Sequence, residues 1–401
     1  MERQRISMLI ATAMMLVGLI LGIGAAQLAG LRLGGVIVVP LVSVYFLQSF
    51  ATLPVFIASV AAAYFSLRIV KNRLLVYGRP LFVLSVIIGA IVPVLVFKIL
   101  SNAVGIGVGL SQIGFIGSVL PGIAAYNYHR IDGDKRVLDM VWSLAIVLFL
   151  SVAGIALVIF VGLSPIAGAL PPVLLSPNSD IANAFGLVVN TEVVPIVMSD
   201  LLTVGLLGLG ILFSEGIRSR YGLRVGGVIV VPLIVIIAFR NGWMLSLWVG
   251  TAVLAYVAVA IVHWWTLLYG RVLLGLGVIM GLLVSISATT VIPARTGLLP
   301  FFTGILGGVT GYNLHVVPPA ERRATVSVTG SVLILVTAVA RFLVIPPQTG
   351  LLVSVSGSHV AIGAAVWLIA LYELYHLERI RPNETIPAIP TGVAERVDDQ
   401  Q

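Results

Sequence analysis

The chain contains thirteen apolar segments that few charges interrupt, most of them about twenty residues long, which is the length that an α-helix needs to cross a bilayer. Only 9% of the 401 residues are charged and 59% are hydrophobic. One soluble core has no room for that much apolar surface. The sequence therefore predicts an all-α polytopic membrane protein with about thirteen transmembrane helices.

Two of these segments are short and contain a proline. They are 34–50 with Pro40 and 226–239 with Pro232, and each is expected to be a tilted, kinked or broken helix. The other expected segments are 7–29, 52–70, 80–101, 105–127, 138–163, 197–217, 244–268, 272–293, 298–316, 325–346 and 355–377.

The basic residues alternate along the chain. Seventeen of the 23 lysines and arginines follow odd-numbered segments, whereas the N-terminus and the connections after even-numbered segments hold five. Because basic loops stay in the cytoplasm, we predict a multi-pass protein of the cell membrane with its N-terminus outside and its C-terminus cytoplasmic. Arg3 and Arg5 at the N-terminus count against this orientation.

The sequence is internally duplicated. "GLRLGGVIVVPL" at 30–41 recurs as "GLRVGGVIVVPL" at 222–233, and Tyr-Gly-Arg and Tyr-Asn-x-His recur after it in the same order. Six segments in each copy, an even number, predict parallel repeats related by an axis along the membrane normal. The expected domains are a first repeat (1–163), a proline-rich extracytoplasmic connection (164–192), a second repeat (193–346), an additional transmembrane segment (347–378) and a polar cytoplasmic tail (379–401).

The duplicated motifs supply the candidate residues for binding a substrate. Each glycine pair either lets helices pack closely or, with the arginine two residues before it, forms an anion site at a helix start. Tyr-Gly-Arg either anchors a helix at the interface of membrane and water or contributes to the anion site. Tyr-Asn-x-His either caps a helix or bonds to a substrate. The candidates are Arg32, Gly34, Gly35, Arg79, Tyr126, Asn127, His129, Arg224, Gly226, Gly227, Arg271, Tyr312, Asn313 and His315.

Acidic residues within or at the edges of the apolar segments are few, and such groups usually face a partner or a cavity. They are Asp139, Asp200, Glu215 and Glu373. Glu215 lies eleven residues before the second glycine motif, and its counterpart in the first copy is Ile23.

Several chemistries are excluded. The chain has no cysteine, no G-x-x-x-x-G-K-[ST] phosphate loop, no H-E-x-x-H and no G-x-S-x-G. The net charge of +8 comes from basic residues scattered over segment ends, which is typical of topology signals. We therefore expect no cofactor, no metal, no catalytic residue and no nucleic-acid partner. The chain is not expected to catalyse a reaction by itself.

The G-x-x-x-G-G-x-x-V-V-P core, the Tyr-Gly-Arg triplet and Pro121-Gly122 resemble the PgsC/CapC family of membrane proteins. The resemblance covers both copies, so the chain is similar to a tandem duplication of the family unit. It implies a membrane subunit for synthesis or export of poly-γ-glutamate, a capsule polymer, working with a separate ATP-dependent amide ligase. In the second copy Gly307-Gly308 replaces the Pro-Gly of the family.

Two other functions fit the same sequence. Twofold parallel repeats and broken helices also suit a secondary transporter of a small organic anion. A structural membrane anchor that recruits a cytoplasmic enzyme is the third possibility. In all three cases the bilayer is a partner.

Overall fold

The computed structural model describes residues 3–104, 119–162, 179–186, 197–288 and 298–380. Every regular element in these ranges is a helix. The first copy consists of α1 (Arg3–Leu28), α2 (Val38–Gln48), α3 (Thr52–Leu74), α4 (Gly78–Val104), α6 (Leu120–His129) and α7 (Gly133–Gly162). The second consists of α9 (Asp200–Tyr221), α10 (Val230–Arg240), α11 (Trp243–Thr266), α12 (Arg271–Ala288), α13 (Leu299–Val316) and α14 (Arg322–Leu343). The remaining elements are α8 (Asp180–Ala184), η3 (Pro319–Glu321) and α15 (Gly357–Ile380).

The all-helical membrane fold is confirmed. Among the described residues nine helices are long and apolar enough to cross a membrane, and α2 and α10 are shorter apolar helices. Each of the thirteen predicted segments contains a helix, although 105–118 and 289–293 lie outside the described residues.

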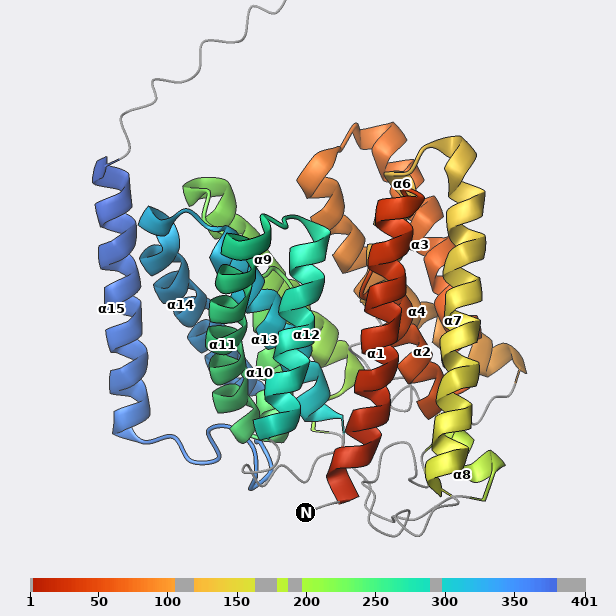
Figure 1. Ribbon diagram of the computed structural model, residues 1–401. Coiled ribbons are helices and arrows are strands. Elements are labelled where there is room, and N and C mark those ends of the chain that lie inside the picture. Colours follow the sequence, from red (N-terminus) through yellow and green to blue (C-terminus); the bar gives the residue numbers. More distant parts are fainter. Residues whose placement is uncertain (1–2, 105–118, 163–178, 187–196, 289–297, 381–401) are drawn as a thin grey trace, which may run out of the picture.

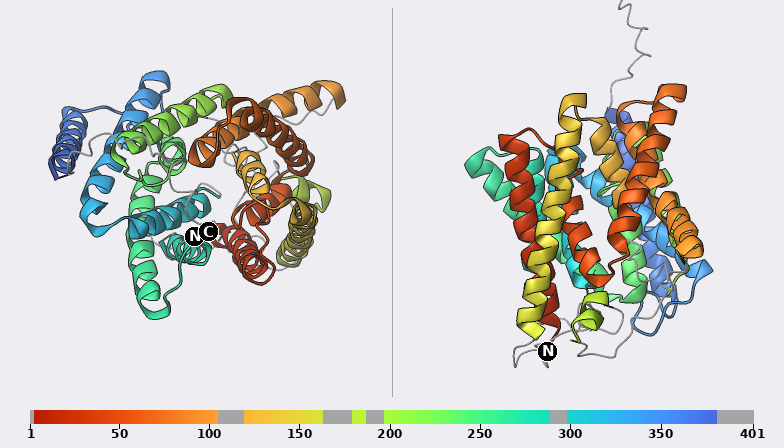
Figure 2. Two further views of the ribbon diagram at one scale, coloured as in Figure 1. Left: turned by 90° about the horizontal axis from the view of Figure 1, so that it is seen from above. Right: turned by 90° about the vertical axis from the view of Figure 1, so that its right-hand side faces the viewer.

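The duplication is visible in the packing. Helix α1 packs on α2 and α7 as α9 packs on α10 and α14, and α3 contacts α4 and α6 as α11 contacts α12 and α13. In Figure 1, α1 and α9 both run upward from the end where the N-terminus lies. Figure 2, seen from above, shows the two copies side by side. This arrangement is that of parallel repeats.

The two copies meet through a reciprocal pair of contacts. Helix α1 packs against α12, and α4 packs against α9. Since α9 is the counterpart of α1 and α12 that of α4, these are the same contact made twice, as a twofold axis along the helices requires.

The prolines of the two short segments start helices and do not kink them. Pro40 and Pro232 are each the third residue of an 11-residue helix, where the missing N–H has no partner in the helix. Each proline packs against a glycine of the preceding long helix: a Cβ at Gly18 would lie 2.5 Å from Pro40 Cβ, and one at Gly210 2.7 Å from Pro232 Cβ. This close approach explains why the proline is repeated.

Helices α2 and α10 are too short to cross a membrane alone. Eleven residues rise about 16 Å, roughly half of the hydrocarbon core. The non-helical segments 29–37 and 222–229 precede them. We call 30–35 and 222–227 the glycine loops; each leads the chain from the end of a long helix to the start of a half-length one.

The bundle has two distinct ends. The connections 75–77, 130–132, 267–270 and 317–321 lie at one end, which we call the basic end, and the N-terminus lies at the other (Figure 1). Helix α15 runs at the edge of the bundle beside α14 and finishes at the basic end. Helix α1 therefore begins and α15 finishes at opposite ends of the bundle, as an odd number of crossings predicts.

The predicted domain boundaries remain predictions. Of the connection 164–192 the structure describes only 179–186, which contain α8. There the Asp180 carboxylate accepts a hydrogen bond of 2.7 Å from the Phe50 N–H, so α8 lies at the end of α2, away from the basic end. Of the tail 379–401, all but two residues lie outside the described part.

Candidate functional site

The glycine loop of the first copy binds an internal carboxylate. The backbone N–H groups of Arg32 and Leu33 donate to Oδ1 of Asp139 over 2.6 and 2.8 Å, and that of Gly34 donates to Oδ2 over 3.4 Å. Asp139, in the second turn of α7, is completely buried. Backbone amides beside Arg32 thus bind a carboxylate that the protein itself supplies.

The loop takes a backbone shape that needs its glycines. Gly34 has a φ of 61° and Gly35 a φ of 127°, a region that residues with a Cβ rarely adopt. Leu33, at 50°, is also left-handed. Successive N–H groups that point to one side make a cradle for an anion, which is how three amides reach one carboxylate.

The asparagine of Tyr-Asn-x-His holds the glycine loop in both copies. Nδ2 of Asn127 donates to the Gly34 carbonyl over 3.0 Å, and Nδ2 of Asn313 donates to the Gly226 carbonyl over 3.3 Å. A side-chain amide that satisfies a loop carbonyl fixes the loop against α6 or α13. The duplicated asparagines therefore position the loops.

An arginine that follows each Tyr-Asn-x-His motif links neighbouring helices at the basic end by hydrogen bonds. Arg136 donates to the Tyr64 hydroxyl over 2.8 Å, and Arg322 donates to the Tyr256 hydroxyl over 2.9 Å. Both arginines also donate to backbone carbonyls at the ends of α6 and α13. The sequence pairs these arginines across the copies, but it does not indicate their structural role.

The two histidines of the motif have different partners. Nε2 of His129 lies 3.0 Å from the Tyr64 carbonyl oxygen, and its ring stacks on that of Tyr64 with the centroids 4.2 Å apart. Nε2 of His315 lies 2.7 Å from Nδ1 of His263. Lys71 stands in the first copy where His263 stands in the second. Within the described residues no group of three or more ligands fit for a metal is present.

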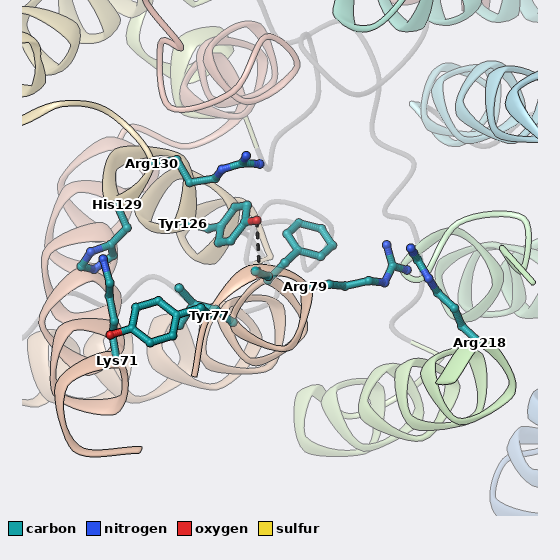
Figure 3. A pocket seen from close by; sticks show the side chains of 10 residues that line it. Lys71, Tyr77, Arg79, Tyr126, His129, Arg130 and Arg218 are labelled. Carbon is teal, nitrogen blue, oxygen red and sulfur yellow. Dashed lines mark hydrogen bonds between the residues drawn. The ribbon is translucent and has the colours of Figure 1, made fainter. Parts of the chain in front are cut away.

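A basic cavity of about 520 Å³ lies at the basic end of the first copy. It is lined by Lys71, Tyr77, Gly78, Arg79, Leu81, Phe82, Tyr126, His129, Arg130 and Arg218. Figure 3 shows Arg79 extending from α4 toward α9, whose Arg218 points into the same space. Three expected residues, Arg79, Tyr126 and His129, line this cavity.

The charge of the cavity is only partly balanced. Nε of Arg79 bonds to both carboxylate oxygens of Glu215, over 3.0 and 3.1 Å. Nη1 of Arg218 is buried and has no hydrogen-bond partner among the described residues. Lys71 and Arg130 lie over the rings of Tyr77 and Tyr126, and neither forms an ion pair within the described residues. An anion entering the cavity would meet several cations that no carboxylate of the described residues pairs with.

Arg271 of the second copy lies close enough to Arg32 of the first copy for their charges to interact. Burial, followed by the like charges of Arg271 and Arg130, lowers the pKa of Arg32 from its ordinary value. Arginine remains charged at neutral pH because its ordinary pKa is far above 7. The three guanidinium groups therefore raise the positive potential beside the cavity.

The second-copy candidates do not line the basic cavity. Arg224 is exposed, Gly226 and Gly227 lie in the second glycine loop, and a Cβ at Gly277 would lie 3.3 Å from Tyr312 Cβ. Asn313 and His315 make the contacts described above. The assignment of all fourteen residues to substrate binding remains a prediction.

Sequence reasoning did not identify Lys71, Arg130 and Arg218 as site residues. In the sequence they count only as topology charges, because nothing in their spacing shows that α3, α4, α6 and α9 enclose one cavity. Asp139 was recognised as an acid at a segment edge, but its amide partners lie more than 100 positions away.

The chain matches a known family in two places. A family model described as capsule biosynthesis CapC matches residues 17–137 and again residues 209–323, together more than half of the chain. Both matches include the glycine loop, the Tyr-Gly-Arg triplet and the Tyr-Asn-x-His motif of their copy. No curated protein matches the chain, and no solved structure matches it.

Proposed function

The chain belongs to the CapC family of capsule biosynthesis and carries the family unit twice, and from this premise we propose that it handles poly-γ-glutamate during synthesis or export. In this proposal the polymer passes the basic cavity as it leaves the enzyme that makes it. The chain is a membrane component of capsule biosynthesis, and the polymer is the part that the proposal adds.

The basic cavity is the observation that carries this proposal. Poly-γ-glutamate has one free carboxylate on every residue, and arginine binds carboxylates through a planar fork of donors. Arg79, Arg130 and Arg218 converge on the cavity with Lys71. Partial burial strengthens such pairs because the local dielectric is lower than that of water.

The proposal includes a separate ATP-dependent amide ligase as partner. Formation of an amide from a carboxylate needs activation, and the chain has no phosphate loop. The basic end is the end that the charge asymmetry assigns to the cytoplasm, where ATP is available. A ligase docked there would release its product beside the cavity.

Removal of the chain from its native cell tests the proposal. We expect surface polymer to disappear and to return with a plasmid copy of the wild-type chain, and acid hydrolysis of the polymer to release glutamate as its main component. A surface polymer that hydrolyses to sugars, or one that persists unchanged without the chain, would contradict the proposal.

Transport of a small organic anion is the second candidate. The half-length helices α2 and α10 begin beside non-helical loops, as discontinuous helices do in transporters. Uptake of glutamate by liposomes that contain only the purified chain would favour this function. If membranes lacking the chain lose the ligase but the purified chain binds no anion, a purely structural anchor is favoured.

A further inference from the structure

The two copies differ at the residue that fills the first glycine loop. Asp139 lies three residues after Arg136, and Thr325 lies three residues after the matching Arg322. The surrounding turns correspond: Ser143 donates to the Asp139 carbonyl as Thr329 donates to the Thr325 carbonyl. The second copy therefore has a threonine in the place of the buried carboxylate.

Three amides of the second glycine loop have no acceptor among the described residues. The N–H groups of Arg224, Val225 and Gly226 correspond to the three donors that bind Asp139. Within the described part of the chain they make no hydrogen bond. The loop nevertheless lies on α14, since a Cβ at Gly226 would approach Thr329 Cγ2 to 2.9 Å.

The hydroxyl that replaces the carboxylate also lacks a partner. Thr325 is 2% exposed, and its Oγ1 is buried without a hydrogen bond among the described residues. Buried polar atoms are rarely left unpaired, because each one costs about 1–3 kcal/mol. By correspondence with the first copy, the three unpaired donors and this hydroxyl take the places of the amides and the carboxylate that bind each other there.

The backbone conformations of the two glycine loops agree with one loop binding a carboxylate and the other having none. Leu33 is left-handed in the filled loop, whereas in the second loop only Gly222, Gly226 and Gly227 have a positive φ. The left-handed form costs a residue with a Cβ about 1–2 kcal/mol, which the bonds to Asp139 offset. Without an anion the second loop keeps Val225 out of that conformation.

We propose that the second glycine loop binds a carboxylate of the substrate in the position that Asp139 occupies in the first. Arg224, exposed and free of any ion pair within the described residues, supplies the neighbouring positive charge. The identification of this carboxylate as part of a glutamyl unit rests on the proposed function. The binding of a carboxylate from outside the chain does not depend on that function.

The first glycine loop is then structural and the second is functional. In the first copy Asp139 locks the loop and balances the charge of Arg32. In the second copy the loop closes on an anion only when substrate arrives, and Val225 takes the left-handed form of Leu33. The first glycine loop thus holds the permanent carboxylate of Asp139, and the second binds an exchangeable carboxylate of the substrate.

Binding of a short γ-linked glutamate oligomer to the purified full chain in nanodiscs tests the proposal. Thr325→Asp supplies the missing carboxylate from within, so binding should fall at least about tenfold, the loss expected when bonds to a charged group are removed. Thr325→Val removes the hydroxyl without supplying a carboxylate, so it should weaken binding less than Thr325→Asp does.

Hydrogen exchange provides a second measurement that needs no variant. Addition of the oligomer should protect the amides of the segment 223–227 and leave those of the segment 31–35 unchanged, because these are already bonded. Equal protection of both segments, or of neither, would overturn the inference.

The outcomes separate the two proposals. If Thr325→Asp binds the oligomer like wild type while Arg130→Gln weakens binding, the loop inference is wrong and the proposed function stands. If the loop binds glutarate but no γ-linked oligomer, the loop inference stands and the proposed function is wrong. If inorganic phosphate displaces the oligomer at equal concentration, the loop is a general anion site and the carboxylate assignment is wrong.

Discussion

Arg79 of the first copy and Glu215 of the second form an ion pair across the interface of the two copies, with Nε 3.0 Å from Oε1. The reciprocal position has no such pair. There Arg271 replaces Arg79, Ile23 replaces Glu215, and the Ile23 side chain packs beside Gly275. One side of the interface is thus neutralised, and the other keeps an arginine that adds its charge to that of Arg32.

Replacing Glu215 tests whether this pair tunes the basic cavity. Glu215→Gln leaves Arg79 without its carboxylate, so the γ-linked oligomer should bind a few-fold more tightly at low salt. Because both side chains are partly exposed, the cost in stability should not exceed about 1 kcal/mol. Glu378→Gln, which removes the exposed partner of Arg220, is the matched control and should change neither quantity. Weaker oligomer binding in Glu215→Gln would contradict this role.

The contact between glycine and proline predicts a stability difference between two neighbouring positions on α9. Gly210→Ala places a Cβ 2.7 Å from Pro232 Cβ, whereas a Cβ at Gly208 meets no atom within 4 Å. Overpacking of this kind costs about 1–3 kcal/mol. The half-life at raised temperature in detergent should fall for Gly210→Ala and stay at the wild-type value for Gly208→Ala. Equal half-lives would show that α10 does not pack closely on α9.

The two loop arginines should differ in importance. Lysine preserves positive charge but not the bidentate fork of arginine. Since the first loop is filled by Asp139, Arg32→Lys should change oligomer affinity by less than about twofold, and Arg224→Lys should lower it about five- to tenfold. Isothermal titration of the two variants measures this directly. The reverse order would place the exchangeable anion in the first copy.

The membrane orientation can be measured by labelling introduced cysteines, because the chain has no cysteine of its own. Ser219 is exposed in the last turn of α9, and Ser354 is exposed in the connection between α14 and α15. Helix α9 runs toward the basic end, and α15 begins at the other end. A membrane-impermeant maleimide added to intact cells should label Ser354→Cys, and it should label Ser219→Cys only after permeabilisation. Labelling of both, or the opposite pattern, would refute the predicted topology.

The sequence predicts the architecture well because its signals are local and are repeated. Hydrophobic length marks the long helices, and the matching motifs mark two copies in the same orientation. The half-length form of α2 and α10 is only partly predictable. Pro40 and Pro232 indicate irregular helices, but where each helix starts depends on loops that Asn127 and Asn313 hold from a distant helix.

The site is less predictable than the fold because tertiary contacts create it. Arg79 and His129 were expected from the motifs, yet Arg218 joins them only because α9 packs on α4. The role of Asp139 depends on three amides that carry no side-chain signature. The exchange of Asp139 for Thr325 is readable in an alignment of the copies, but its meaning needs the hydrogen bonds.

ATP-dependent synthesis of polymer by isolated membranes tests the central claim most directly. Membranes that contain the chain and its co-purifying partner are supplied with ATP and labelled glutamate, and γ-linked polymer is quantified. We predict polymer formation with wild type, a loss of at least about tenfold when Lys71→Gln is combined with Arg130→Gln, and wild-type levels with Arg73→Gln, an exposed residue of α3 that does not line the cavity. Polymer formation that is equal in all three, or that proceeds without the chain, would contradict the claim that this membrane subunit handles poly-γ-glutamate.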